Sequence, residues 1–374
     1  MQRWHVITGE YPPQPGGVSD YSLLVASALA RAGDPVEVWA PAWDEGGAPE
    51  PGVRLHRLPG HFGPRALIAL DRTLAQDPGG RLLVQYVPHS FGLKAMNLPF
   101  CYWLYSRRHW NIDVMFHEVA FQRRTAQPLR HNLLGEVNSL MAKLVARSAQ
   151  RIFVASMAWE RVLRRLVPNL GQIEWLPIPS NIPVIDNPAM AAGVRARYAR
   201  GALLVGHFGT YGDPIRVYLE RILPDLVQSA NACVLLMGRG SLEFRGSLLL
   251  RCPSLAPVIY ATGELEPAAL SHHISACDLM IQPYPDGVSA RRTSAMATIS
   301  HGRATITTLG HLTEEYWSAS GGVTLVPADA PDSLLQKAVY LLEDAPARNQ
   351  LGQRARELYK DLFDLQYTIR KLRA

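Results

Sequence analysis

The chain has 374 residues, 48% of them hydrophobic, which is enough for two domains of ordinary size. Its four cysteines (Cys101, Cys233, Cys252, Cys277) show no C-x-x-C spacing, so the sequence indicates neither a zinc site nor a disulfide framework. The net charge of +6 favours an anionic partner, and every apolar run is too short for a signal sequence or for the ~20 residues of a membrane span.

The first half of the chain alternates strands and helices, which is typical of a doubly wound α/β domain. A strand at residues 4–8 runs through a Gly-rich turn into a helix with an apolar period at about residues 19–31. Ligands of such domains bind at the carboxyl ends of the parallel strands. Gly16 and Gly17 in this turn would let a ligand approach the backbone closely, although a simple tight turn explains them equally. The next expected elements are strands at 36–40, 53–58 and 82–87 and helices at 64–75 and 100–110.

A strand at residues 112–116 ends at His117 and Glu118. This pair lies where α/β folds place catalytic groups, at the carboxyl end of a central strand. The alternative is a strand-end histidine that hydrogen-bonds to a nearby carbonyl.

The segment from Lys94 to Arg165 is basic, with twelve Lys or Arg residues against four Asp or Glu residues. It includes Arg123, Arg124, Arg130 and His131, a helix expected at 128–149, a strand at 152–155, and a helix on which Arg161, Arg164 and Arg165 share a face. That face is either solvated or attracted to anionic lipid headgroups. No nucleic-acid reading module is recognisable, and the aromatic residues at 100–110 fit a core and an acceptor cleft better than a base-stacking surface. We therefore expect a cytoplasmic protein, with peripheral contact at the inner face of the membrane as a further hypothesis, and no nucleic-acid partner.

After a strand at 173–176, residues 177–190 are Pro-rich and predict an irregular hinge between two domains. The alternation then starts again, with Gly209, Gly238 and Gly263 in the turns that follow three of the strands. The expected strands lie at 203–208, 233–237, 258–260, 279–282, 305–308 and 323–326, the expected helices at 214–228, 267–276 and 332–342, and a basic helix ends the chain.

The loop after residues 279–282 carries the densest set of polar groups. It places Asp286, Gly287, two hydroxyl side chains, Arg291 and Arg292 at or just before the start of a helix. A diphosphate suits such a position, because free N–H groups and the positive end of the helix dipole point out of a helix N-terminus. An ordinary capped helix with solvated arginines is the alternative.

The order of these signals resembles a GT-B glycosyltransferase of the large retaining family that contains sucrose synthase and the bacterial phosphatidylinositol mannosyltransferases. The resemblance covers nearly the whole chain. It rests on Gly16-Gly17, His117, Gly209, the MGRG sequence at 237–240, Gly263, and CDLMIQP followed by the acidic loop and HGRATITT. The resemblance implies an α/β fold with two doubly wound Rossmann-like domains that face a central cleft. The expected domains are residues 1–185 for the acceptor, 186–355 for the nucleotide sugar, and a C-terminal helix at 356–374 that returns to the first domain.

The sequence departs from the family pattern at five positions. The family loop reads Glu-Gly-x-Gly, with a second glutamate after it that binds the ribose. Here Asp286 replaces the first glutamate, Ser289 the second glycine, and Ser294 the second glutamate. A serine cannot chelate a ribose diol as a carboxylate does. The family's Arg and Lys that neutralise the diphosphate are also not both present, because Thr210 occupies the Arg position and only Arg216 is near the Lys position. Arg291 and Arg292 are therefore expected to supply the missing charge.

By resemblance, the reaction is transfer of a sugar from a nucleotide diphosphate sugar, with UDP favoured, and with retained anomeric configuration. The chain contains no D-x-D motif, in agreement with a site that needs neither a metal nor a cofactor. The base is expected near residues 263–265, the diphosphate near Gly209 and residues 287–289, and the sugar between Asp286 and His117, which are the expected catalytic residues. The expected donor-binding residues are Gly17, Gly209, Thr210, Arg216, Gly238, Gly263, Glu264, Leu265, Gly287, Val288, Ser289, Arg291, Arg292 and Ser294. The expected acceptor-binding residues are Gly16, Asp20, Tyr21 and Glu118.

Several functions stay open from the sequence. The acceptor is either a lipid-linked glycan or a soluble small molecule. A nucleotide-sugar epimerase would share the architecture, and would convert its sugar without any acceptor. A nucleotide-sugar-binding protein without activity is the third hypothesis, because Ser294 and Thr210 both depart from the family pattern.

Overall fold

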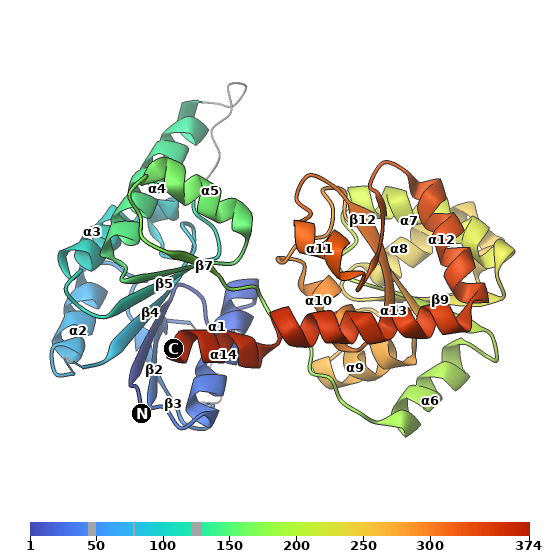
Figure 1. Cartoon of the computed structure of the whole chain (residues 1–374), viewed down its shortest axis with the longest axis horizontal. Helices are drawn as coiled ribbons and strands as arrows, with labels where there is room; N and C mark the ends of the chain where they lie inside the picture. The colour runs from blue at the N-terminus through green and yellow to red at the C-terminus, as the bar shows by residue number, and fades with distance from the viewer. Residues whose placement is uncertain (44–49, 78, 121–128) are drawn as a thin grey trace. The chain divides into compact units, whose positions relative to one another are not determined.

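The computed structural model describes residues 1–43, 50–77, 79–120 and 129–374. Contacts divide the chain into unit 1, which comprises Met1–Ile178 and Leu365–Ala374, and unit 2, which comprises Pro179–Asp364. Each unit is a parallel sheet with helices on both faces (Figure 1). The predicted pair of doubly wound α/β domains is therefore confirmed. Arg123 and Arg124, which belong to the predicted basic segment, lie outside the described residues.

Unit 1 contains a seven-stranded parallel sheet in the order β3-β2-β1-β4-β5-β6-β7. Its strands are β1 (Trp4–Thr8), β2 (Val36–Pro41), β3 (Val53–Leu58), β4 (Arg81–Tyr86), β5 (Ile112–Phe116), β6 (Arg151–Val154) and β7 (Ile173–Trp175). Every residue of β1 and β5 is buried, as expected for central strands covered on both faces. The strand order reverses between β1 and β4, so the carboxyl ends of these two strands flank the position where such sheets bind ligands.

The helices of unit 1 cover the two faces of its sheet. They are α1 (Gly17–Arg31), α2 (Pro64–Leu74), η1 (Leu93–Ala95), α3 (Leu98–Ser106), α4 (Leu129–Ser148), α5 (Met157–Leu166) and α14 (Leu365–Arg373). One face packs against α1 and α14, and the other packs against α2, α3, α4 and α5. Helix α1 presents Tyr21, Val25, Ala28 and Leu29 to the sheet, at the spacing of a buried helical stripe.

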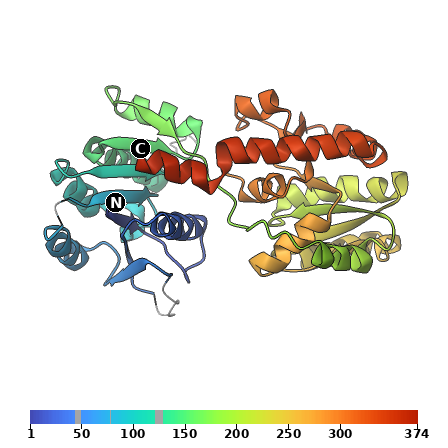
Figure 2. The same cartoon turned by 60° about the horizontal axis from the view of Figure 1, so that its bottom comes forward.

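The C-terminal helix α14 belongs to unit 1, as predicted, and packs beside α1 (Figure 2). Its side chains Ile369 and Leu372 are buried in the core that α1 shares. Arg151 donates hydrogen bonds to the carbonyl oxygens of Lys371 and Leu372 and is ion-paired with the buried Asp113 on β5. Carbonyls in the last turn of a helix lack intrahelical donors, so Arg151 caps this end of α14 and fixes it to the sheet.

Unit 2 contains a six-stranded parallel sheet in the order β10-β9-β8-β11-β12-β13. Its strands are β8 (Leu203–Phe208), β9 (Ala232–Met237), β10 (Ile259–Ala261), β11 (Leu279–Gln282), β12 (Ala304–Leu309) and β13 (Thr324–Pro327). The order reverses between β8 and β11, which places the expected binding edge at the carboxyl ends of these two strands.

The helices of unit 2 also form two layers. They are α6 (Pro188–Tyr198), α7 (Asp213–Ser229), α8 (Ser241–Arg251), η2 (Pro253–Leu255), α9 (Pro267–Ala276), α10 (Thr293–Ser300), α11 (Glu315–Ser320), α12 (Pro331–Glu343), α13 (Ala345–Leu358) and η3 (Tyr359–Phe363). One core contains side chains from α7, α8 and α12, and the other contains side chains from α6, α9 and α10.

Two helices of unit 2 were not predicted. Helix α6 begins inside the Pro-rich stretch that predicted an irregular hinge. The Asn187 side chain accepts a hydrogen bond from the Met190 N–H, and Pro188 is the first helical residue. Asn-Pro is therefore a helix start here and not a turn, because an Asn N-cap followed by Pro is also a favoured N-terminus. The short helix α11 was the second omission.

No helix among the described residues is both long enough and apolar enough to span a membrane.

Candidate functional site

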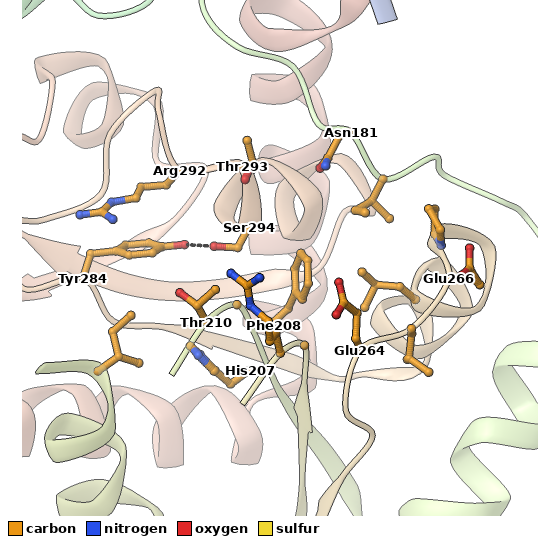
Figure 3. A pocket seen from close by; sticks show the side chains of 18 of the residues that line it. Asn181, His207, Phe208, Thr210, Glu264, Glu266, Tyr284, Arg292, Thr293 and Ser294 are labelled. Carbon is orange, nitrogen blue, oxygen red and sulfur yellow. Dashed lines mark hydrogen bonds between the residues drawn. The ribbon is translucent and has the colours of Figure 1, made fainter. Parts of the chain in front are cut away.

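Unit 2 contains a pocket of about 630 Å³ at the carboxyl ends of β8, β9 and β11, beside the point where the strand order reverses (Figure 3). Eight of the expected donor-binding residues line it. They are Gly209, Thr210, Gly238, Glu264, Leu265, Arg291, Arg292 and Ser294. Its volume lies in the range of small-molecule sites. Eight of the fourteen residues expected to bind the donor therefore line one pocket, and their binding of a donor stays a prediction.

Three predicted glycines meet through their backbones beneath the pocket. The Gly238 N–H donates to the Gly263 carbonyl at 3.0 Å, and the Gly209 N–H donates to the Met237 carbonyl at 3.2 Å. A Cβ on Gly238 would lie 2.3 Å from the Gly209 oxygen, and φ of Gly238 is +102°. These glycines therefore allow the turns after β8, β9 and β10 to pack closely. The N–H groups of Gly209 and Gly238 donate to protein carbonyls and are not presented to a ligand.

The hydroxyl of Ser294 lies at the start of α10, where it hydrogen-bonds to the Tyr284 hydroxyl at 2.8 Å (Figure 3). The Arg292 guanidinium lies 4.8 Å from the centre of the Tyr284 ring and 3.9 Å from the Asp286 carboxylate. Burial raises the pKa of Tyr284 to about 12, so its hydroxyl is protonated at neutral pH. Tyr284 thereby orients both Ser294 and Arg292 at one end of the pocket.

Thr293 and Ser294 occupy the first turn of α10 and line the pocket. Backbone N–H groups in a first turn have no intrahelical acceptor, and the helix dipole makes this end positive. Arg239, Arg291 and Arg292 line the same pocket and add positive charge. The arrangement suits an anionic ligand.

The loop from Asp286 to Ala290 is held by the protein itself. The Gly287 N–H donates to the Tyr284 carbonyl at 3.0 Å, and the Val288 N–H donates to the Thr308 carbonyl at 2.8 Å. The Ala290 N–H donates to the Glu314 carboxylate at 3.2 Å, and this carboxylate also accepts from the Trp317 indole. Burial raises the pKa of Glu314. The N–H groups of residues 287 and 288 are therefore already engaged within the protein, whereas Arg291 and Arg292, which follow this loop, line the pocket.

Six other expected site residues of unit 2 lie outside the pocket lining. Val288 and Ser289 are buried in the loop, and Asp286 is half exposed, with His311 at 3.9 Å. Gly287 and Gly263 shape their turns at positive φ. Arg216 is the sixth, because it donates to the Ser247 hydroxyl at 3.1 Å, on the neighbouring helix α8. Its guanidinium is thus directed away from the pocket's polar groups.

Unit 1 brings its own expected residues together at the carboxyl edge of β1, β4 and β5. The His117 ring packs edge-on against Tyr21, with centroids 4.8 Å apart, and its Nε2 hydrogen-bonds to Gln85 Oε1 at 2.8 Å. The amide oxygen is an acceptor only, so Nε2 carries the proton and Nδ1 is the basic nitrogen of the neutral ring.

The loops beside His117 carry two carboxylates. His89 lies 3.7 Å from Glu10 and 3.8 Å from Glu118, and burial raises the pKa of Glu10. A Cβ on Gly16 would lie 2.4 Å from the Glu10 carboxylate, so a side chain at this position would require that carboxylate to move. Gly17 and Asp20 form the first turn of α1. Glu10 and His89 were not predicted, although both follow strands as His117 does.

Metal binding finds no support in the geometry, because no group of three or more His, Cys, Asp or Glu residues could hold an ion in the part of the chain that the structure describes.

Comparison with known proteins agrees with this architecture. Residues 16–179 match the family model described as a glycosyl transferase 4-like domain, which corresponds to most of unit 1. Unit 1 therefore contains a glycosyl transferase 4-like domain. A comparison with curated protein sequences gave no match.

Solved structures of GT-B glycosyltransferases share the fold of this chain over its whole length. Sucrose-phosphate synthase from Thermosynechococcus elongatus is 19% identical, with a TM-score of 0.69 over 100% of this chain and 97% of that one. WaaG, a glycosyltransferase of lipopolysaccharide biosynthesis, is 16% identical, with a TM-score of 0.67 over 99% and 98%. HepE of Anabaena, solved in complex with UDP-glucose, is 13% identical, with a TM-score of 0.66 over 99% and 98%. At these identities the likeness establishes the GT-B fold.

Sequence reasoning missed several residues of the unit 2 pocket, including His207, Arg239, Glu266 and Tyr284. Tyr284 belongs to the PYPDG turn, so its position was visible, but only the structure shows that it pairs with Ser294. His207 sits inside a buried strand and gave no sequence signal.

His207 is buried and neutral beneath the pocket. Its Nδ1–H donates to the Ile281 carbonyl at 2.8 Å, and its Nε2 has no hydrogen-bond partner among the described residues. Burial lowers its pKa to about 4. Protonation would therefore place an uncompensated charge in the core.

The burial of neutral His207 predicts that the folded state loses stability in acid. Between pH 6.5 and 4 the unfolded state binds a proton at His207 that the folded state excludes, so stability falls as the pH falls through this window. A shift of this size corresponds to about 3 kcal/mol at pH 4. In His207→Phe, we expect urea midpoints that drop less between pH 7 and pH 4.5 than those of the wild type. The exposed His311→Asn variant is the control and should keep the wild-type pH dependence. Equal pH dependence of His207→Phe and wild type would contradict the prediction.

Proposed function

We propose that this protein is a glycosyltransferase that transfers a sugar from a nucleotide diphosphate sugar, with a UDP-sugar favoured, and retains the anomeric configuration. The pocket of unit 2 carries this proposal. It combines arginines and a helix N-terminus at one end with carboxylates and apolar side chains at the other, which suits a ligand that is anionic in one part and rich in hydroxyl groups in another. HepE and an α-glucosyltransferase, both of the same fold, were solved with UDP.

In the proposed reaction, negative charge develops on the leaving diphosphate as the sugar departs. Arg291, Arg292 and the N-terminus of α10 are fixed before the reaction begins, so they stabilise this charge without reorganising. Asp286 is proposed to bind hydroxyls of the transferred sugar. Its half-exposed carboxylate and its proximity to Arg292 support that role.

His117 is proposed to contact the transferred sugar from unit 1, with Gly17 beside it. The acceptor is proposed to bind at Gly16, Asp20, Tyr21 and Glu118. The support for the His117 role is its position at the carboxyl end of β5, where its Nε2 is held by a hydrogen bond to Gln85.

A lipid-linked glycan is the acceptor class that we favour. The support is the surface of unit 1, where Arg161, Arg164 and Arg165 on α5 are exposed and the apolar side chains of Leu133 and Leu140 on α4 are exposed as well. Exposed apolar and basic groups on neighbouring helices suit a peripheral contact with anionic membrane.

The test of the donor is a thermal-shift panel of UDP-, GDP-, ADP- and dTDP-sugars. A ligand at 100 times its dissociation constant stabilises by about 2.7 kcal/mol, so one nucleotide should raise the unfolding midpoint clearly above the others. We expect the UDP-sugars to do so. If none of the nucleotide sugars raised the unfolding midpoint above that of the others, the proposed donor class would be wrong. Conversion of the bound sugar without any acceptor would indicate the epimerase instead, and saturable binding with neither transfer nor hydrolysis would indicate an inactive binding protein.

A further inference from the structure

We propose that Glu264 chelates the ribose diol of the nucleotide and thereby fixes the direction in which the nucleotide sugar lies in the pocket of unit 2. The inference rests on the proposed function and assigns a role to a side chain that the sequence placed only near the base.

The first argument is that the Ser294 hydroxyl already has a hydrogen-bond partner within the protein. A vicinal diol offers two O–H donors, and a carboxylate accepts both at once. Ser294 has a single hydroxyl, and that hydroxyl already hydrogen-bonds to Tyr284 at 2.8 Å. The N-terminus of α10 therefore holds no acceptor pair for a diol, and another carboxylate has to supply it.

The second argument is the set of carboxylates that the pocket contains. Glu264 and Glu266 are the two acidic residues that line it, and both are exposed. Figure 3 shows Glu264 pointing from the turn after β10 toward the middle of the pocket, near Phe208, whereas Glu266 lies at the edge. Within the described chain, the Glu264 carboxylate has no hydrogen bond or ion pair, so both of its oxygens are available to a ligand.

The third argument is the separation of charge along the pocket. Figure 3 places Arg292 and Tyr284 at one end and Glu264 and Glu266 toward the other, with Ser294, Thr210 and Phe208 between them. A diphosphate near Glu264 would meet a like charge, whereas beside Arg292 it meets an opposite one. The diphosphate therefore lies toward α10, and the nucleoside lies toward the turn between β10 and α9, where Glu264 reaches the ribose.

The experiment compares dissociation constants of a ribonucleoside diphosphate and its 2′-deoxy form by calorimetry, in the intact wild-type protein, Glu264→Gln and Glu266→Gln. The probes are UDP and 2′-deoxy-UDP, or the matching pair for whichever base the donor panel selects. We expect the wild type to prefer the ribonucleotide by about tenfold, because the deoxy form lacks one of the two hydroxyls. In Glu264→Gln the ribonucleotide should bind about tenfold more weakly and the deoxy form nearly as before, so that the preference disappears. Glu266→Gln should keep the wild-type preference.

Each result decides for or against the role of Glu264. A wild type without ribose preference overturns it, as does a Glu264→Gln variant that keeps the preference or changes only the choice of base. Failure of the wild type to bind any nucleoside diphosphate overturns the proposed function itself, which separates the two conclusions. Both glutamates are exposed, so glutamine at either position leaves the core intact.

Discussion

Replacing Gly287 with alanine is expected to destabilise unit 2 by about 4 kcal/mol, from backbone strain and a steric collision together. The φ angle of Gly287 is +88°, in a region that costs an alanine free energy. A Cβ there would also lie 2.2 Å from Thr313 Oγ1 and 2.3 Å from the Gly310 nitrogen. Rotation of Thr313 relieves only the first contact, because the second is with backbone. The loop between β11 and α10 would therefore have to shift as a whole.

Alanine variants at two other glycines of unit 2 distinguish the cost of backbone strain from the cost of steric collision. Gly321→Ala meets only ordinary contacts at φ +60°, so it should cost about 1 kcal/mol. Gly246→Ala lies in the exposed interior of α8 with nothing within 4 Å, and should be neutral or stabilising. Scanning calorimetry measures the three variants against the wild type. For a domain of this size, each kcal/mol of destabilisation lowers the unfolding midpoint by about 2–4 °C, so the midpoint of Gly287→Ala should lie ~10 °C below that of the wild type. A midpoint equal to that of Gly321→Ala would show that the loop absorbs the methyl group without cost.

The glycine positions were predictable from the sequence because a tight backbone contact or a positive φ angle restricts which residue type can occupy a position. Gly209, Gly238 and Gly263 each follow a strand, in the turns that meet after β8, β9 and β10. Glycine is favoured at Gly238, where a Cβ would collide with the Gly209 carbonyl, and at Gly263, where φ is +73°. A side chain at such a contact is excluded by sterics, so the residue type itself records the geometry. The alternation of buried strands and amphipathic helices is recorded in the same way, which is why both units were predicted from the sequence.

The directions of long side chains were not predictable in this way. Arg216 was expected near the diphosphate, but in the structure it reaches the Ser247 hydroxyl on α8, and an arginine on the first turns of a helix has several such partners within reach. The pairing of Tyr284 with Ser294 is a second example, since Ser294 lies ten positions after Tyr284 in the chain and only the fold of the intervening loop brings the two hydroxyls together. Conversely, Asn187 and Pro188 form a local helix start that is visible in the sequence, but it was interpreted as part of an irregular hinge.

The double replacement Arg291→Ala/Arg292→Ala is expected to weaken donor binding by about 100-fold or more, because each charge-assisted phosphate contact contributes about 1.5–3 kcal/mol. Each single replacement should cost about tenfold. Arg292 also stacks on Tyr284, so Arg292→Lys, which keeps the charge but not the planar guanidinium, should recover only part of the affinity. Titration calorimetry with the nucleotide sugar selected by the donor panel measures these differences.

The control for nonspecific loss of positive charge is Arg216→Ala. This residue donates to Ser247 and lies outside the pocket lining, so donor affinity should stay within about threefold of wild type. Unfolding midpoints without ligand show whether any variant is merely unstable. If both single alanine variants bind the donor within about twofold of wild type, the arginines do not neutralise the diphosphate, because a charge-assisted contact contributes more than that. The N-terminus of α10 and Arg239 would then have to carry that charge, and a larger loss in Arg216→Ala than in the double variant would place the diphosphate near α7 and α8 instead.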